Sequence, residues 1–167
     1  MGAHKIKSGE VITLPKEDKV KVAVIGLFNG KPAILNLTRS EQETSRIGGD
    51  DLLGGGLLPG ELPYDGAVRE AWEEARLKLD YLTELGIHKG RKHVWAAIGR
   101  GVVVLSHEHS DWGWIPVDEY EQSNLPDDYK NILLSKRSLR DINALAEIAT
   151  REQTIVGYQV KRELVAA

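Results

Sequence analysis

The segment Arg69–Leu77, REAWEEARL, places three glutamates at helical spacing, Glu70, Glu73 and Glu74. Residues three and four positions apart are neighbours on a helix, so Glu70 lies beside both other carboxylates, and such like-charge pairs are destabilising. No basic residue stands three or four positions from Glu70. A carboxylate cluster without local compensation suits a hard divalent cation, which prefers oxygen ligands. The spacing therefore indicates a metal site, while the alternative is an ordinary solvent-exposed helix face.

Three consecutive glycines, Gly54, Gly55 and Gly56, precede the glutamates. A glycine backbone adopts conformations that are closed to other residues and can approach a ligand closely. Carbonyl oxygens or amides in such a loop can therefore meet a metal ion or a phosphate group. The alternative is a flexible loop that binds nothing.

The spacing of these residues resembles the Nudix box of the Nudix hydrolases, written GX5EX7REUXEEXGU with U a bulky aliphatic residue. Gly55 is followed after five residues by Glu61, and Glu61 is followed after seven residues by the segment Arg69–Leu77. Every charged position of the box and its first glycine are present. This combination is far more specific than a glycine-rich loop alone.

Two positions depart from the box. Ala71 is a small residue at an aliphatic position, and Arg76 stands where the family has its second glycine. Glycine at that point would help to end the helix in a left-handed conformation. We therefore expect the arginine to let the helix continue through Lys78 and Leu79.

The resemblance implies Mg²⁺ as the cofactor, with Mn²⁺ as a substitute. The implied metal ligands are the carbonyl oxygen of Gly54 and the carboxylates of Glu70, Glu73 and Glu74. Glu70 and Glu73 would also take part in catalysis. By the same resemblance, Arg69 would orient the glutamates through a salt bridge, Glu61 would support the loop and the metal cluster, and Gly55 and Gly56 would contact the substrate.

Glu108, in the stretch LSHEHSDWGWIP, is our candidate for the general base outside the box. Similar Glu-His or Gln-His pairs a few residues before a tryptophan occur in family members that act on nucleoside triphosphates or nucleotide sugars. The alternative is a solvated loop carboxylate. His107 and His109 flank Glu108, but two histidines two positions apart need further ligands to bind zinc, so we do not predict a histidine metal site.

Two further residues are candidates for substrate binding. Arg39 follows the second strand of an expected hairpin, where many family members have an arginine, and it could contact a phosphate or form a surface ion pair. Trp114 could stack on a nucleotide base, although a tryptophan near a strand is more often part of the core.

Periodicity predicts the elements that must position these residues. Residues 20–39 are predicted to form a hairpin around Asn29-Gly30, and residues 40–65 a long functional loop. A helix is expected to begin near Asp65 as its N-cap, with the glutamates opposite a core-facing stripe. The residues of that stripe are Val68, Ala71, Trp72, Ala75 and Leu79.

The rest of the chain mixes strands and a helix. Residues 93–105 are predicted to form one strand or a pair, a short strand ends near Pro116, residues 130–150 are helical, and residues 154–164 could add a terminal strand. We predict an α/β fold with a mixed β-sheet flanked by helices. The resemblance implies the Nudix-type α/β/α sandwich.

Composition limits the classes of function. The 167 residues, 41% of them hydrophobic, favour a single domain over 1–167 with 1–19 as an N-terminal extension. The net charge of −3 and the lack of a long basic run disfavour an extended nucleic-acid partner. The sequence has no cysteine, no signal peptide and no long apolar span, so we expect no membrane association and a cytoplasmic location.

The resemblance implies a metal-dependent hydrolase that cleaves a pyrophosphate bond in a nucleoside diphosphate derivative. We favour a nucleoside triphosphate or a nucleotide sugar as substrate, with a coenzyme A or dinucleotide pyrophosphatase as alternatives. A non-catalytic, nucleotide-binding or regulatory Nudix-like module is a further alternative, disfavoured because such modules commonly lose box carboxylates. A calcium-binding structural protein is disfavoured because the ligands lack EF-hand spacing. Since dimers are frequent in the family, a homodimer is the oligomer to consider.

Overall fold

Strand β1 (Lys19–Phe28) is central to the sheet of this computed structural model, which describes residues 17–152. One edge of β1 pairs in parallel with β6 (Lys92–Arg100). The opposite edge pairs antiparallel with β4 (Leu53–Gly56) along its first half and with β2 (Lys31–Arg39) along its second. Nearly every residue of β1 is buried, as expected of a strand that is covered on both faces.

Three more strands complete the sheet, and each of them pairs with a neighbour of β1. The strands β3 (Asp50–Asp51) and β7 (His109–Pro116) pair with β2, while β5 (Lys78–His88) pairs with β6. The seven described strands thus combine parallel and antiparallel pairing in one mixed sheet.

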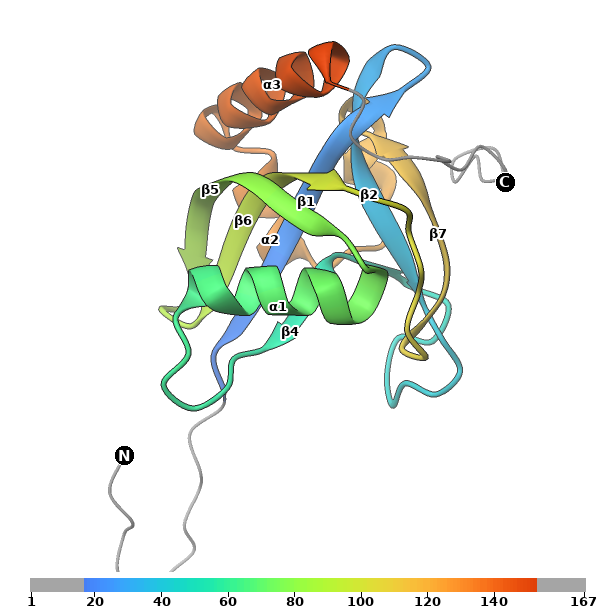
Figure 1. The fold of residues 1–167 in the computed structure, drawn as a ribbon, viewed down its shortest axis with the longest axis vertical. Coiled ribbons are helices and arrows are strands. Elements are labelled where there is room, and N and C mark those ends of the chain that lie inside the picture. Colours follow the sequence, from blue (N-terminus) through green and yellow to red (C-terminus); the bar gives the residue numbers. More distant parts are fainter. Residues whose placement is uncertain (1–16, 153–167) are drawn as a thin grey trace, which may run out of the picture.

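Helices lie on both faces of this sheet (Figure 1). Helix α1 (Pro63–Ala75) crosses one face. A 3₁₀ turn, η1 (Val117–Gln122), leads from β7 to α2 (Asp127–Leu133) and α3 (Lys136–Arg151), which pack on the other face. This arrangement confirms the predicted α/β/α sandwich.

Alternation along β1 divides the hydrophobic core into two parts. The valines of β1 pack with Ala67, Ala71 and Ala75 of α1. On the other face, Ala23 and Ile25 pack with apolar side chains of α3. Because alanine side chains are short, α1 lies close to the sheet.

The predicted hairpin is confirmed. Phe28 pairs with Lys31, which leaves Asn29 and Gly30 as a two-residue turn with φ of 51° and 75°. Both residues tolerate positive φ, as the I′ type of turn requires. The predicted loop over 40–65, in contrast, contains the short strands β3 and β4.

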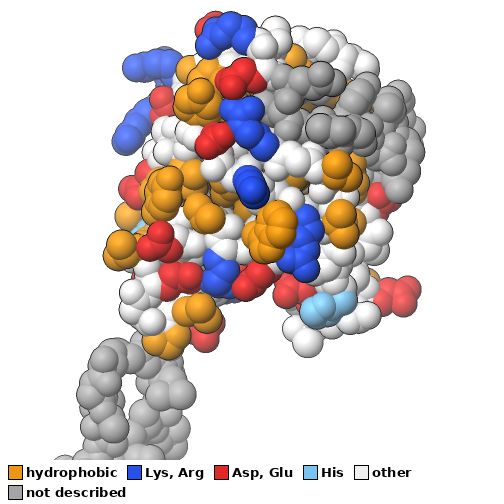
Figure 2. All heavy atoms as spheres, viewed as in Figure 1, with side chains coloured by type: hydrophobic (Ala, Val, Ile, Leu, Met, Phe, Trp, Pro, Cys, Tyr) orange, Lys and Arg blue, Asp and Glu red, His pale blue; other side chains and the backbone are white. Residues whose placement is uncertain are grey.

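The prediction for the start of α1 was wrong, and the predicted core-facing stripe was right only for Ala71 and Ala75. The helix begins at Pro63 with Leu62 as N-cap. Asp65 lies in its first turn, where a negative charge interacts favourably with the helix dipole. Val68 and Trp72 are 40% and 47% exposed, so they belong to the outer face, where hydrophobic side chains lie among charged ones (Figure 2). The buried residues of α1 are Gly66, Ala67, Glu70, Ala71, Glu74 and Ala75.

The expectation that Arg76 would prolong the helix was also wrong. Arg76 has a φ of 57° and is the left-handed C-cap of α1, in the conformation expected of the missing glycine. Its backbone N–H donates to the carbonyl of Trp72, and its guanidinium lies 5.3 Å from the centroid of the Trp72 ring. Lys78, two residues later, already pairs with Arg100 in the sheet, so the chain must leave the helix at this point.

Other predicted elements differ from the structure. The strand β5 was not predicted, because its residues are mostly exposed or half-buried and two register shifts hide its alternation in the sequence. The single helix predicted over 130–150 is two helices, because Ser135 caps α3 by accepting a 3.2 Å hydrogen bond from the N–H of Ser138. The predicted strand over 154–164 and residues 1–16 of the predicted extension lie outside the described residues.

The packing of β4 on β1 makes Gly54 the least replaceable glycine of this strand. Its φ is +139°, and a Cβ would lie 2.1 Å from the carbonyl oxygen of Val20. We expect Gly54→Ala to lower the free energy of unfolding by about 3 kcal/mol or more, because backbone strain and overlap add. Gly60→Ala is the matched control, since Gly60 also has positive φ, at +77°, but faces open space. It should cost about 1 kcal/mol. If urea unfolding showed equal losses of unfolding free energy for Gly54→Ala and Gly60→Ala, the close packing of Gly54 on β1 would be contradicted.

Candidate active site

Helix α1 and strand β4 hold two buried carboxylates between them. Glu70 and Glu74 are only 9% and 2% exposed. The backbone N–H of Gly54 donates a 2.6 Å hydrogen bond to Glu74 Oε1. A Cβ on Gly55 would lie 2.8 Å from Glu70 Oε1, so a larger residue would displace that carboxylate. The glycines therefore allow β4 to contact the carboxylates of Glu70 and Glu74 directly, although all three glutamates were expected to lie opposite the core-facing stripe.

Arg69 links α1 to the strand and loop that precede it. Its guanidinium donates two hydrogen bonds of 2.9 Å to Glu61, and these lower the pKa of Glu61 to about 2. It also contacts Glu70 at 3.2 Å and Glu73 at 3.0 Å. A further 3.0 Å hydrogen bond reaches the carbonyl of Gly56. One cation thus fixes three box glutamates relative to β4.

The three glutamates of α1 have different environments. Burial raises the pKa of Glu70, although the adjacent Arg69 acts in the opposite direction. The Glu73 side chain is 55% exposed and lies on the outer side with Arg69. Burial raises the pKa of Glu74 to about 9, against the charge of Lys21 and with a further contribution from the carboxylate of Glu108. The most buried of the three glutamates is therefore the one that most needs a compensating cation or proton.

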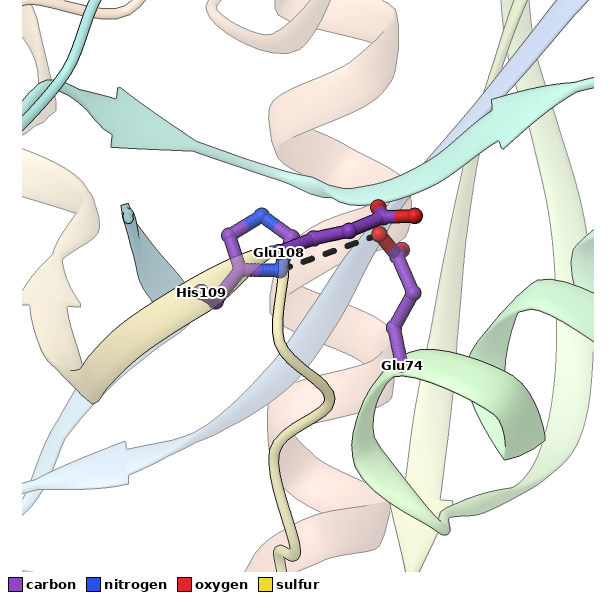
Figure 3. A group of neighbouring side chains, drawn as sticks. All are labelled: Glu74, Glu108 and His109. Atoms are coloured by element: carbon purple, nitrogen blue, oxygen red, sulfur yellow. Dashed lines mark ion pairs between the residues drawn. The ribbon is translucent and has the colours of Figure 1, made fainter. Parts of the chain in front are cut away.

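Glu74, Glu108 and His109 form one cluster, with one ligand atom from each residue within 4.8 Å of the others. Figure 3 shows Glu74 extending from α1 toward Glu108 and His109, which come from the turn before β7 and from its first residue. The half-buried Glu108, predicted as the base, thus lies beside the predicted metal ligand Glu74.

Sequence analysis missed a buried polar chain next to this cluster. Lys21 Nζ lies 2.9 Å from Asp51 Oδ1 and also donates to the carbonyls of Leu52 and Gly54. The other oxygen of Asp51 lies 2.9 Å from His109 Nε2. Although burial opposes both charges, the ion pair raises the pKa of Lys21, and hydrogen bonds from His109 and Lys21 hold the pKa of Asp51 below its usual range. The available signal was a lysine inside an apolar strand.

The predicted substrate-binding residues lie in different surroundings. Arg39 is occupied by ion pairs with Asp51 and Glu43, both at 3.3 Å, which is the alternative foreseen for it. Trp114 is 3% exposed and packs in the core over Gly26, so its ring offers almost no surface for stacking on a base. This burial corrects the expectation for Trp114 and agrees with the core alternative.

The unpartnered atoms of the cluster fit a divalent metal ion. Glu74 Oε2 and His109 Nδ1 are both buried and have no hydrogen-bond partner. Buried polar atoms are normally paired, and two facing acceptors require a proton or a cation between them. Carboxylate oxygens and an imidazole nitrogen are donors that divalent metals use.

Sequence comparison assigns the family. Residues 18–135 match the NUDIX domain. The chain therefore belongs to the Nudix hydrolases. No curated protein matches the sequence.

Solved Nudix structures have the same fold. A MutT protein from Methanosarcina mazei is 24% identical with a TM-score of 0.56, over 78% of this chain and 98% of its own. The NUDIX domain of Shewanella oneidensis NrtR, complexed with ADP ribose, is 15% identical with a TM-score of 0.57, over 77% and 89%. A C. elegans Ap4A hydrolase is 22% identical with a TM-score of 0.52, over 77% and 98%. At these identities the likeness shows the fold alone.

Membrane insertion through a helix is not supported by the described part of the chain. None of its helices has both the length and the apolar character that a bilayer span requires.

The raised pKa of Glu74 predicts how the stability of the metal-free protein depends on pH. In the folded chain the carboxyl group of Glu74 has a pKa of about 9, against 4.5 for an ordinary glutamate. Between these two pH values the folded state therefore binds more protons than the unfolded state. The contribution of Glu74 to the free energy of unfolding therefore falls as the pH rises through this window. We expect Glu74→Gln to gain stability relative to the parent with rising pH, by at most about 1.4 kcal/mol per pH unit.

Urea unfolding in EDTA at several pH values between 5 and 9 checks this expectation. Glu147→Gln, on an exposed position of α3, is the matched control and should show no pH-dependent difference. A difference between parent and Glu74→Gln that stays constant with pH would show that Glu74 titrates normally.

Proposed function

We propose that the protein is a metal-dependent hydrolase that cleaves a pyrophosphate bond in a nucleoside diphosphate derivative. The observation that carries this proposal is the pair of buried carboxylates, Glu70 and Glu74, held against the glycines of β4 with Glu108 beside them. A site of this charge binds cations, and a pyrophosphate needs cations on its oxygens before a nucleophile can approach. Mg²⁺ is the proposed cofactor, with Mn²⁺ as a substitute.

The proposed metal ligands are the carbonyl of Gly54 and the carboxylates of Glu70, Glu73 and Glu74. When bound, the metal neutralises charge on the phosphate oxygens and lowers the pKa of water. Glu74 and Glu70 support this role best, because they are buried and face the glycine strand. For the carbonyl of Gly54 the support is weaker, since Lys21 already donates to it at 3.4 Å.

Glu108 is the proposed general base. Its carboxylate is half-buried next to Glu74, where it could take a proton from a water aimed at phosphorus. Arg69 is the proposed positioning residue, because it holds Glu70, Glu73 and Glu61 at once. Gly55 and Gly56 are proposed to face the substrate phosphates.

A nucleoside triphosphate or a nucleotide sugar is the proposed substrate. Arg39 could reach a phosphate only by giving up contacts that it makes in this structure. The similar proteins include one complexed with ADP ribose and one named an Ap4A hydrolase, so dinucleotides and related pyrophosphates, coenzyme A among them, are the alternatives. A non-catalytic nucleotide-binding module is the other alternative, and the complete set of box carboxylates argues against it.

The organisation of the protein is proposed from its sequence. One Nudix domain over 1–167, with 1–19 as an extension, agrees with the family match over 18–135. A homodimer and a cytoplasmic location follow from the frequency of dimers and from the composition.

The deciding experiment is product-resolved chromatography after incubation with Mg²⁺ or Mn²⁺. The panel contains nucleoside triphosphates, nucleotide sugars, dinucleoside polyphosphates, ADP-ribose, NADH and coenzyme A. We expect cleavage at phosphorus in one of these classes, and a folded protein that cleaves none of them would contradict the proposal. Tight binding of a panel member without turnover would favour the binding module.

Glu74→Gln should lower turnover by about 10³-fold or more, because it removes a ligand charge at nearly constant size. The fold should survive, which circular dichroism and thermal unfolding can confirm. Glu147→Gln, a substitution of the same kind on the opposite face of the sheet, should keep the activity of the parent. A Glu74→Gln enzyme as active as this control would remove Glu74 from the proposed ligands.

Glu108→Gln separates the base from the metal ligands. A positioned general base contributes about 10² to 10⁴ in rate, so turnover should fall by that factor. Calorimetric titration with Mn²⁺ should show binding close to that of the parent. Loss of binding together with turnover would instead make Glu108 a ligand.

A further inference from the structure

His109 is a buried residue of the cluster to which sequence analysis gave no role. Its side chain is 1% exposed. One ring nitrogen, Nε2, lies 2.9 Å from Asp51 Oδ2, while the other, Nδ1, faces Glu74 Oε2 at 3.7 Å (Figure 3). The distance of 3.7 Å is too long for a hydrogen bond. His109 Nδ1 and Glu74 Oε2 have no other hydrogen-bond partner. The ring is thus held firmly on one side only.

Asp51 determines which nitrogen of His109 carries the hydrogen. Lys21 lies 2.9 Å from one oxygen of Asp51, and Arg39 lies 3.3 Å from the other. Flanked by two cations, Asp51 is ionised and can only accept hydrogen bonds, so Nε2 of His109 must be the donor. In the neutral imidazole, Nδ1 then has a free lone pair directed at Glu74. A hydrogen on Nδ1 would find no acceptor within hydrogen-bond distance, whereas a lone pair can meet a cation.

This arrangement is the one that histidine ligands adopt in metal sites. A ligating histidine almost always donates its other N–H to a carboxylate or carbonyl, which fixes the tautomer and the ring orientation. Asp51 provides that carboxylate, and Lys21 in turn holds Asp51. Two donors on one ion with bonds of about 2.1 Å lie about 3 to 3.5 Å apart, which is close to the observed separation.

We propose that Nδ1 of His109 is a metal ligand of this site, alongside the carboxylate of Glu74, while the neighbouring Glu108 keeps its proposed role as the base. The inference rests on the proposed function only in assuming that Glu74 binds a metal. A nitrogen donor among oxygen donors favours transition metals over Mg²⁺, because imidazole suits transition ions while Mg²⁺ prefers an all-oxygen shell. His109 therefore biases the site toward Mn²⁺ and its neighbours in the transition series.

Pulsed electron paramagnetic resonance of the full-length protein loaded with one equivalent of Mn²⁺ tests the ligand directly. We expect a coupling from a directly bound ¹⁴N nucleus. In protein grown with ¹⁵N-histidine, this coupling should be replaced by that of ¹⁵N. This isotope comparison needs no substitution, so it holds even if a variant fails to fold.

Variants assign the coupling to one histidine. His109→Gln should lose the nitrogen coupling and bind Mn²⁺ at least about 10-fold more weakly, the lower end of what perturbing even an outer partner costs. His107→Gln, two residues away at an exposed position, is the matched control and should keep both. If His109→Gln does not fold, each of the other histidines is replaced in turn. A nitrogen coupling that survives in every one of these variants assigns the coupling to His109.

Metal competition measures the predicted selectivity. The ratio of the Mg²⁺ to the Mn²⁺ dissociation constant should fall by at least about 5-fold in His109→Gln, because the lost donor contributes little to Mg²⁺ binding. An unchanged ratio would overturn the proposed bias.

The outcomes separate this inference from the proposed function. Mn²⁺ that binds without any nitrogen coupling overturns the role of His109 and leaves the carboxylate site intact. Failure of the parent to bind Mn²⁺ overturns both. A nitrogen coupling in a protein that hydrolyses nothing would support the ligand while contradicting the hydrolase.

Discussion

The close approach of α1 to β4 is the constraint on which the site depends. Alanines on the helix and glycines on the strand remove the side chains that would hold the two elements apart. Glu70 and Glu74 are thereby buried at an interface that would otherwise be apolar. Isolated buried charges are unfavourable, so the fold keeps them only with compensation. Arg69 compensates on the outer side and Lys21 on the inner side.

The inner compensation is organised as a chain of alternating charges and dipoles. Lys21, Asp51 and His109 come from three different strands, and each is fixed by the next. Satisfied polar networks in a low-dielectric interior are rigid, since every alternative geometry leaves a group unpaired. The rigidity extends to Glu74, whose Oε1 is held by Gly54 while Oε2 is left available. The protein therefore holds the Glu74 carboxylate in place through one oxygen and leaves the other oxygen without a hydrogen-bond partner.

Local patterns in the sequence were sufficient for the Nudix family, the Asn29-Gly30 hairpin and the class of fold. Local patterns were insufficient where contacts between residues far apart in the sequence determine the structure. Asp51 lies 30 residues from Lys21 and 58 from His109, so neither contact leaves a local pattern. The buried face of α1 was predicted from the helical spacing of its apolar residues, yet the face that packs on the sheet carries alanines and two carboxylates, and Trp72 lies outside it. Arg76 shows the same limit, because the tertiary need to begin β5 overrides the conformational preference of its side chain.

The position of β1 has a consequence for the order of folding. Its pairing with β2 closes across two residues, and such hairpins form within about 1 to 10 μs. Its pairing with β6 is parallel and joins Lys19 to Lys92, so a much longer loop must close first. The carboxylates come together only after β4 has added to the first half of β1, next to that late partner. A chain that has made only the N-terminal hairpin thus lacks the pairing of β4 with β1, and with it the burial of Glu70 and Glu74.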